Sequence, residues 1–249
     1  MSGSKAHSFL IRLLTSLVIV CILIPAYILF DGIPLKAILF IAVCIAAVEA
    51  RSLMDYAEEL RKKAPKRPNF LRSRNYTPDG QLAVFVLLLI IGASLATMRD
   101  RVYIGLAMVG TVTTDASAYL VGTCIGGKIF KVRPFPQASP KKSWEGLIGG
   151  MVFGLIAINL WLKYFVPSPL TFVQVLAFMS IPILAICGDV VESSLKRGYG
   201  VKDVNDHTPS FLAPFEKLLG GREGHGGYLD RLDSLAFVLI TVMLASPKL

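Results

Sequence analysis

The sequence predicts an all-α polytopic membrane protein. Of its 249 residues, 54% are hydrophobic and only 17% are charged, and the mean hydropathy is +0.61. A soluble domain typically has about 25% charged residues. The apolar residues also lie in long blocks, and about 20 apolar residues are what a helix needs to cross the hydrocarbon core of a bilayer. We therefore expect one integral membrane domain over residues 1–249.

Seven apolar blocks predict about seven transmembrane helices. The first block has 23 residues, more than the 7–15 of the apolar region of a secretory signal peptide, and a second block follows at once. It is therefore expected to be a helix of the protein itself. The blocks run over residues 8–30, 34–50, 81–97, 102–123, 146–166, 170–190 and 232–245.

Lys and Arg residues are divided unequally between the two sets of loops. If the N-terminus is cytoplasmic, the loops on that side hold 20 of them and the opposite side holds three. Because cytoplasmic loops carry an excess of Lys and Arg, we expect a multi-pass protein with catalytic loops on the cytoplasmic side, in the inner membrane if the source is bacterial. The formal charge of +9 then indicates lipid headgroups and phosphates as partners, and no nucleic acid.

Several acidic residues lie where a membrane helix normally avoids them. Glu49 is near the end of the second block, Asp115 is in the middle of the fourth, and Asp189 is near the end of the sixth. Asp230 and Asp233 lie where the seventh begins. An ionisable residue inside a span costs a few kcal/mol, so its default interpretation is functional. Clustered carboxylates with few histidines favour Mg²⁺ over zinc. The alternative is structural: the acids would pair with Arg197, Lys202 and Arg231.

Two loops that lead into apolar blocks have the composition of a phosphate site. Residues 139–146 read Ser-Pro-Lys-Lys-Ser-Trp-Glu-Gly, and residues 224–227 read Gly-His-Gly-Gly. Glycine lets the backbone approach a ligand closely, and the start of a helix presents unpaired N–H groups, which favours phosphate. For His225 alone, a place in a turn is a commoner explanation than a catalytic role.

In their order along the chain, these motifs resemble the signature of the phosphatidate cytidylyltransferases, also called CDP-diacylglycerol synthases. The resemblance rests on residues 188–197, the Lys202-Asp203 pair, residues 225–234, and two upstream motifs at 115–119 and 139–146. Together they span about half of the chain. Residues 1–100 match only as hydrophobic hairpins, so residues 101–249 are the expected catalytic region.

The resemblance implies an enzyme that condenses CTP with phosphatidic acid to give CDP-diacylglycerol and pyrophosphate. It also implies Mg²⁺ as cofactor, and it leaves open a second, monovalent cation and a homodimer. The metal ligands that it implies are Asp189, Asp230 and Asp233. The implied catalytic residues are Asp189, Asp230, Lys196, Arg197, Lys202, Asp203 and His225. The implied substrate-binding residues are Ser139, Lys141, Lys142, Glu145, Asp115, Tyr119, Ser193, Gly226, Gly227 and Arg231.

The sequence departs from the family pattern in three places. Residues 204–223 lengthen a loop, Glu223 stands where the family has proline, and Ala116 stands where it has a hydroxyl residue. The free energy of loop closure grows slowly with length, so the site can still assemble. The departures affect the expected substrate preference and the roles of Asp115 and Asp203.

Two other functions fit part of the pattern. A CTP-dependent cytidylyltransferase that acts on another lipid phosphate would keep the same motifs. A membrane transporter would explain the acids inside the spans, but it gives no reason for the Lys-Lys and Gly-His-Gly-Gly loops on one face.

Overall fold

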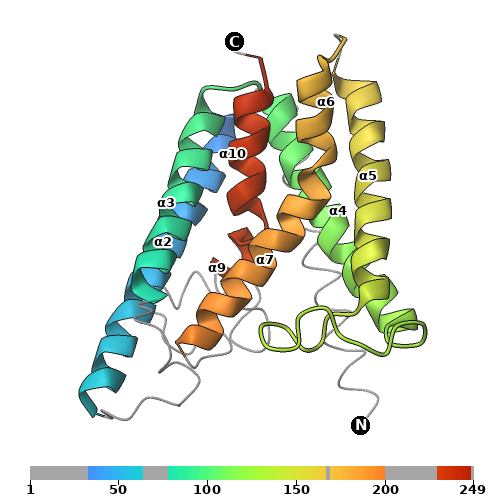
Figure 1. Cartoon of the computed structure of the whole chain (residues 1–249). Coiled ribbons are helices and arrows are strands. Elements are labelled where there is room, and N and C mark those ends of the chain that lie inside the picture. The colour runs from blue at the N-terminus through green and yellow to red at the C-terminus, as the bar shows by residue number, and fades with distance from the viewer. Residues whose placement is uncertain (1–32, 64–77, 167–168, 200–228, 248–249) are drawn as a thin grey trace.

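The computed structural model describes residues 33–63, 78–166, 169–199 and 229–247, and within these ranges the regular secondary structure is helical (Figure 1). The helices are α2 (Ile33–Lys63), α3 (Pro78–Thr97), α4 (Arg101–Ile125), α5 (Trp144–Phe165), α6 (Phe172–Met179), α7 (Ile181–Gly198), α9 (Leu229–Leu232) and α10 (Leu235–Ala245). This confirms the all-α class predicted from the sequence.

Four helices are long and apolar enough to cross a membrane. Their candidate spans are Lys36–Tyr56, Asp79–Thr97, Arg101–Ile125 and Trp144–Phe165, which match four of the predicted blocks. Helices α6 and α7 form a fifth span if the bent pair is counted as one. The chain is thus an integral membrane protein with up to five candidate spans in its described part. The predicted block at 8–30 lies outside the described residues.

The sixth predicted block is a bent pair of helices rather than one continuous helix. Helices α6 and α7 meet at an angle of 41°, and Pro182 lies in the first turn of α7. Proline has no N–H to donate to residue 178, and its ring clashes with the carbonyl of that residue, so a straight helix cannot continue through it. The bend turns α7 across the bundle, beneath α10 (Figure 1).

The last apolar block forms a short helix. Helix α10 has 11 residues, which rise about 16 Å, or roughly half of the hydrocarbon core. Its C-terminal end lies beside the start of α6, because Gln174 Nε2 donates to the carbonyl of Ala245 at 3.1 Å. Asp233 and Ser234, which precede α10, therefore lie well inside the bundle.

Helices α4 and α5 pack closely along a row of glycines on α5. Gly146, Gly150 and Gly154 are spaced four residues apart and are buried. A Cβ atom added at Gly150 would lie 2.9 Å from the Thr114 carbonyl oxygen and 2.9 Å from the Ala118 Cβ. Small residues at this spacing let two membrane helices approach closely. The packing fixes the start of α5 against the C-terminal half of α4.

Candidate active site

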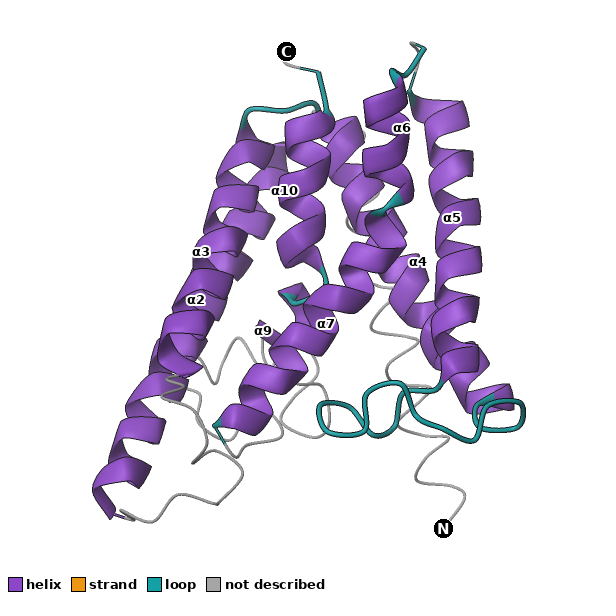
Figure 2. Cartoon of the chain, viewed as in Figure 1, coloured by secondary structure: helices purple, strands orange, loops and turns teal. Residues whose placement is uncertain are grey.

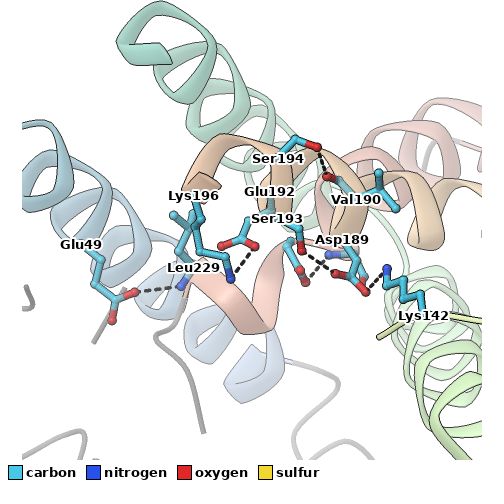
Figure 3. A network of polar contacts seen from close by, with 11 residues as sticks. Glu49, Lys142, Asp189, Val190, Glu192, Ser193, Ser194, Lys196 and Leu229 are labelled. Atoms are coloured by element: carbon cyan, nitrogen blue, oxygen red, sulfur yellow. Dashed lines mark hydrogen bonds and ion pairs between the residues drawn. The ribbon is translucent and has the colours of Figure 1, made fainter. Parts of the chain in front are cut away.

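An ion pair joins the loop before α5 to the middle of α7. Lys142 Nζ lies 2.5 Å from Asp189 Oδ2, and the two side chains are 20% and 32% exposed (Figure 3). Ser193, one turn further along α7, donates its hydroxyl to Asp189 Oδ1 at 3.4 Å. The structure thus brings together three residues that the sequence assigned to one site, across 47 positions of the chain between Lys142 and Asp189.

Two more carboxylates lie beside Asp189. The carboxylate of Asp115 lies near the side chains of Ser234, Asp189 and Lys142. Asp233 is 7% exposed, and its carboxylate lies near the negatively charged carboxylates of Asp189 and Asp115. Its Oδ1 accepts the N–H of Ser234 at 2.6 Å. Three acids from α4, α7 and the turn between α9 and α10 therefore lie close to one another.

A glycine on α7 allows this convergence. A Cβ atom at Gly188 would collide with the carbonyl of Asp233, and it would lie 3.0 Å from the Ser234 Cα. Only glycine leaves room for a backbone to come this close. Gly188 thus holds the turn at 233–234 directly against the residue that precedes Asp189.

Glu49 holds the start of α9, the short helix that leads into the turn at Asp233. Its side chain is fully buried in α2, and Oε2 accepts the N–H of Leu229, the first residue of α9, at 2.9 Å (Figure 3). Glu49 was recognised in the sequence only as an acid near the end of an apolar block. The structure shows that it ties the N-terminal half of the chain to the segment that carries Asp230 and Asp233.

The other charged residues of α7, which are Glu192, Lys196 and Arg197, lie in its C-terminal half, beyond Asp189. Lys196 Nζ lies 2.8 Å from Glu192 Oε2, and Glu192 is only 1% exposed. Arg197 follows Ser193 by one turn. The structural alternative named Arg197, Lys202 and Arg231 as partners of the acids. In the described part of the structure Asp189 pairs with Lys142 and Glu192 pairs with Lys196, whereas Lys202 and the side chain of Arg231 lie outside that part.

Glu145 makes its contacts within the loop that joins α4 to α5. Its Oε1 accepts the N–H groups of Gly127, Ile129 and Phe130 at 3.1, 2.9 and 2.8 Å, and the side chain is 4% exposed. The sequence assigned Glu145 to substrate binding. Its three bonds attach the loop to the first turn of α5, and the predicted contact with substrate stays a prediction.

Arg133 supplies a second attachment that sequence reasoning missed. Its Nη1 donates to the carbonyls of Lys141 and Lys142 at 3.4 and 3.5 Å. Ser143 caps α5 by accepting the N–H of Gly146 at 3.2 Å. These contacts, with Glu145, hold the backbone on both sides of Lys142. An arginine eight residues before a lysine carries no sequence signal of this kind.

Other predicted site residues are not joined to the acids by a described contact. Tyr119 on α4 is 58% exposed. Lys141 is exposed, and the Ser139 carbonyl accepts the N–H of Lys142 at 3.2 Å. Asp230 and Arg231 belong to α9, but their side chains lie outside the described part of the structure. Lys202, Asp203, His225, Gly226 and Gly227 lie outside it altogether.

The carboxylates have the chemistry of a magnesium site but do not complete one. Among the described residues, no group of three or more His, Cys, Asp or Glu side chains is placed so that it could hold a metal ion by itself. Mg²⁺ is commonly held by one or two carboxylates together with water and the phosphates of a substrate. Asp189 and Asp233 fit that pattern as hard oxygen donors, with Asp230 as the further ligand that the sequence predicts.

Known proteins with similar sequences include several phosphatidate cytidylyltransferases. The protein of that name from Bacillus subtilis is 36% identical over 138 residues, which are 55% of this chain and 44% of that protein. The one from Thermotoga maritima is 36% identical over 140 residues, 53% of this chain and 44% of that protein. Phosphatidate cytidylyltransferase 4, chloroplastic, from Arabidopsis thaliana is 38% identical over 129 residues, 51% of this chain and 28% of that protein. Each match covers less than half of the relative's own length.

A family-wide comparison covers nearly all of the chain. The sequence model described as the cytidylyltransferase family matches residues 9–246, which include every described helix and all three of the acids that converge. The match therefore extends over the N-terminal hydrophobic hairpins as well as the motifs from Asp115 onward. On this ground the chain belongs to the cytidylyltransferase family.

Proposed function

We propose that the chain is a CTP:phosphatidate cytidylyltransferase, which converts CTP and phosphatidic acid to CDP-diacylglycerol and pyrophosphate. The observation that carries the proposal is the convergence of Asp115, Asp189 and Asp233 with Lys142 inside a bundle of membrane helices. Family membership supports a reaction that uses CTP. The names of the relatives support phosphatidate as the acceptor.

In this reaction a phosphate oxygen of phosphatidate attacks the α-phosphorus of CTP. A new P–O bond forms as the bond from the α-phosphorus to the bridging oxygen breaks, and that oxygen leaves with its electron pair as part of pyrophosphate. No covalent intermediate with the protein is needed, so catalysis depends on positioning and on charge neutralisation. Two anionic reactants repel each other, and the cationic side chains must reduce that repulsion.

Lys142 is the described residue best placed for this task. Its ammonium group already lies beside a carboxylate, and the loop that carries it is held by Glu145 and Arg133. We propose that Lys142 exchanges Asp189 for a phosphate oxygen when substrate binds, and that Lys141 assists from the exposed side of the loop. Lys196, Arg197, Lys202 and Arg231 would contact phosphates as the family motif implies.

We propose that Asp189, Asp230 and Asp233 hold Mg²⁺ together with phosphate oxygens. When bound, the ion would neutralise charge on the phosphates and on the pyrophosphate leaving group. Asp115, which lies near Ser234, would then orient the turn that carries Asp233. This assignment follows from the hard oxygen donors that lie together and from the positions of the family motif.

The proposal is tested by incubating the purified protein with CTP labelled at the α-phosphate, Mg²⁺ and phosphatidic acid. We expect a labelled liponucleotide and one pyrophosphate for each product molecule. Asp189→Ala should abolish both. Asp55→Ala is the matched control, because Asp55 is an exposed acid on α2 that pairs only with its neighbour Arg51 in the described contacts. Full product formation by the Asp189 variant would refute the proposed site.

The same assay separates the alternatives. If another lipid phosphate is the true acceptor, product forms from that lipid and not from phosphatidic acid in a panel of acceptors. A transporter would release no pyrophosphate with any acceptor.

A further inference from the structure

Residues 128–133 lie in the loop between α4 and α5 and consist of three cationic and three apolar residues. We call them the basic apolar segment. Ile129, Phe130 and Val132 are 68%, 44% and 75% exposed. Lys128 and Lys131 between them are also exposed. The loop runs along one end of the bundle, where α4, α5 and α7 have their ends (Figure 2). Exposed apolar side chains that cluster in this way mark a surface that contacts another molecule or a membrane.

The depth of the segment is fixed by its contacts with α5. The N–H of Phe130 lies 2.8 Å from the Glu145 carboxylate, and Glu145 directly follows Trp144, the first residue of the span. Trp144 is 42% exposed. Tryptophan at the end of a membrane span marks the level of the lipid headgroups. The basic apolar segment therefore lies at the boundary between bilayer and water.

The backbone of this turn is suited to that boundary. Irregular backbone is costly in a membrane because its N–H and C=O groups lose their hydrogen bonds to water. Here one buried carboxylate oxygen accepts three of those N–H groups, from Gly127, Ile129 and Phe130. Gly127 has a φ of +78°, which lets the turn fold around Glu145. The side chains of Ile129 and Phe130 are left free to point outward.

The charges specify the partner further. Lys128 and Lys131 have no ion-pair partner among the described residues, and Arg133 donates to backbone carbonyls. An anionic headgroup would supply the missing counter-charges while the apolar side chains enter the acyl region. Arg133 connects this surface directly to Lys141 and Lys142 at the candidate site.

From these contacts we propose that the basic apolar segment is a docking surface for the interface of an anionic bilayer. Ile129, Phe130 and Val132 insert among the lipids, and Lys128 and Lys131 gather anionic headgroups beside the loop that carries Lys142. The surface would enrich phosphate-bearing lipid next to the candidate site. The inference requires only that the chain is inserted in a membrane, so it can hold or fail independently of the proposed reaction.

The test places an indole on the surface in the full-length protein. Phe130→Trp and, as a matched control in the same loop, Gln137→Trp are reconstituted separately in vesicles of phosphatidylcholine with 30% phosphatidylglycerol, a composition chosen here as about one anionic lipid in three. Gln137 is an exposed polar residue of the loop. The emission that each new indole adds to that of native Trp144 and Trp161 is measured with acrylamide in the water or with lipids brominated in the acyl chain.

The expected result is that bromolipids quench the indole at 130 and acrylamide quenches the indole at 137. At equal mole fraction, brominated phosphatidylglycerol should quench the indole at 130 more than brominated phosphatidylcholine. Adding Lys128→Gln and Lys131→Gln to the Phe130→Trp variant should remove this preference. Each Lys near an anionic membrane surface increases the affinity for that surface by about fivefold.

Two outcomes would overturn the proposal. Quenching of the indole at 130 by acrylamide as strong as at 137 would place the segment in water. Equal quenching by the two brominated lipids would show that the cations select no anionic headgroup. Val132→Trp repeats the measurement at a second exposed position if the variant at 130 does not fold. None of these measurements uses CTP or turnover, so a failure here is distinct from a failure of the proposed activity.

Discussion

At the scale of single residues, the ion pair between Lys142 and Asp189 is the most informative contact. Both residues were assigned to the site from the sequence, but their pairing could not be predicted, because no rule of spacing relates positions so far apart. The same is true of Glu49. Its placement near the end of an apolar block indicated a function, whereas its partner, the N–H of Leu229, is visible only in three dimensions.

Replacing Lys142 by methionine should lower kcat by about 10²–10³-fold, the usual effect of removing one group that stabilises developing charge. The apolar stem would remain, and only the ammonium group that faces Asp189 would be lost. Turnover measured with saturating CTP tests this. Lys163→Met is the control, since Lys163 is exposed at the opposite end of α5. Equal kcat values for the two variants would contradict a role for Lys142.

Replacing Glu49 by alanine should destabilise the protein by about 1–3 kcal/mol, because the buried N–H of Leu229 would lose its acceptor. Thermal unfolding in detergent measures the effect. Glu49→Gln keeps a side-chain oxygen at the same place and should recover most of the lost stability. If alanine and glutamine behave alike, the hydrogen bond to Leu229 is not what Glu49 contributes.

At the scale of helices, the sequence predicted α3, α4 and α5 well, but the predicted block at 34–50 ends well before α2 does at Lys63, and the bent pair α6 and α7 was not predicted. The apolar blocks at 102–123 and 146–166 lie within two residues of α4 and α5 at each end. The block at 170–190 was predicted as one helix because hydropathy counts Pro182 as one residue among many. Its missing N–H nevertheless breaks the helix in two. Hydropathy likewise could not show that Glu145 binds its own loop.

Gly188→Ala tests the close contact between α7 and the turn at Asp233. The added Cβ would collide with a backbone carbonyl, so the turn must move, at a cost of about 1–3 kcal/mol. Asp233 would shift away from Asp189, and we expect activity to fall by more than the amount of folded protein does.

Gly80→Ala is the matched control for that experiment. A Cβ at Gly80 in α3 meets no atom within 4 Å, so the same substitution should be neutral or stabilise by about 0.4–1 kcal/mol. Activity assays and thermal unfolding of both variants complete the comparison. Loss of activity in the Gly80 variant as well would mean that the effect is not specific to the turn.

Glu145→Ala should free the loop between α4 and α5. The amides of Gly127, Ile129 and Phe130 lose their common acceptor, so their hydrogen exchange should become faster. Amides in the middle of α3 serve as the internal control and should be unchanged. Protection at the three loop amides that survives the substitution would show that the loop is held by other contacts.

At the scale of the whole molecule, the bundle has two chemically different ends. One end carries the loop between α4 and α5, which includes the basic apolar segment, and the other carries the short loops beside α6 and the end of α10 (Figure 1). The fold class and the gathering of acids at one site were predictable from composition and motifs. The depth of that site was not, because it depends on how far α10 extends through the bundle.

The excess of Lys and Arg predicts that the loop between α4 and α5 is cytoplasmic. In a variant without native cysteines, Ser139→Cys should react with a membrane-impermeant maleimide only when the cytoplasmic face is accessible. Thr171→Cys, in the loop before α6, should react only from the opposite face. Labelling of both cysteines from one side would refute this topology.

The shortness of α10 has a consequence for the membrane itself. Its 11 residues, of which Thr241 is the polar one, rise about 16 Å from the turn at Asp233 toward the opposite end of the bundle. Fewer apolar layers therefore separate the turn at Asp233 from that end of the bundle than a full-length span of about 20 residues would provide. The buried side chains of Leu239, Val242 and Met243 therefore act as a seal. An enzyme built in this way has to stay impermeable to protons and ions, as a closed channel does.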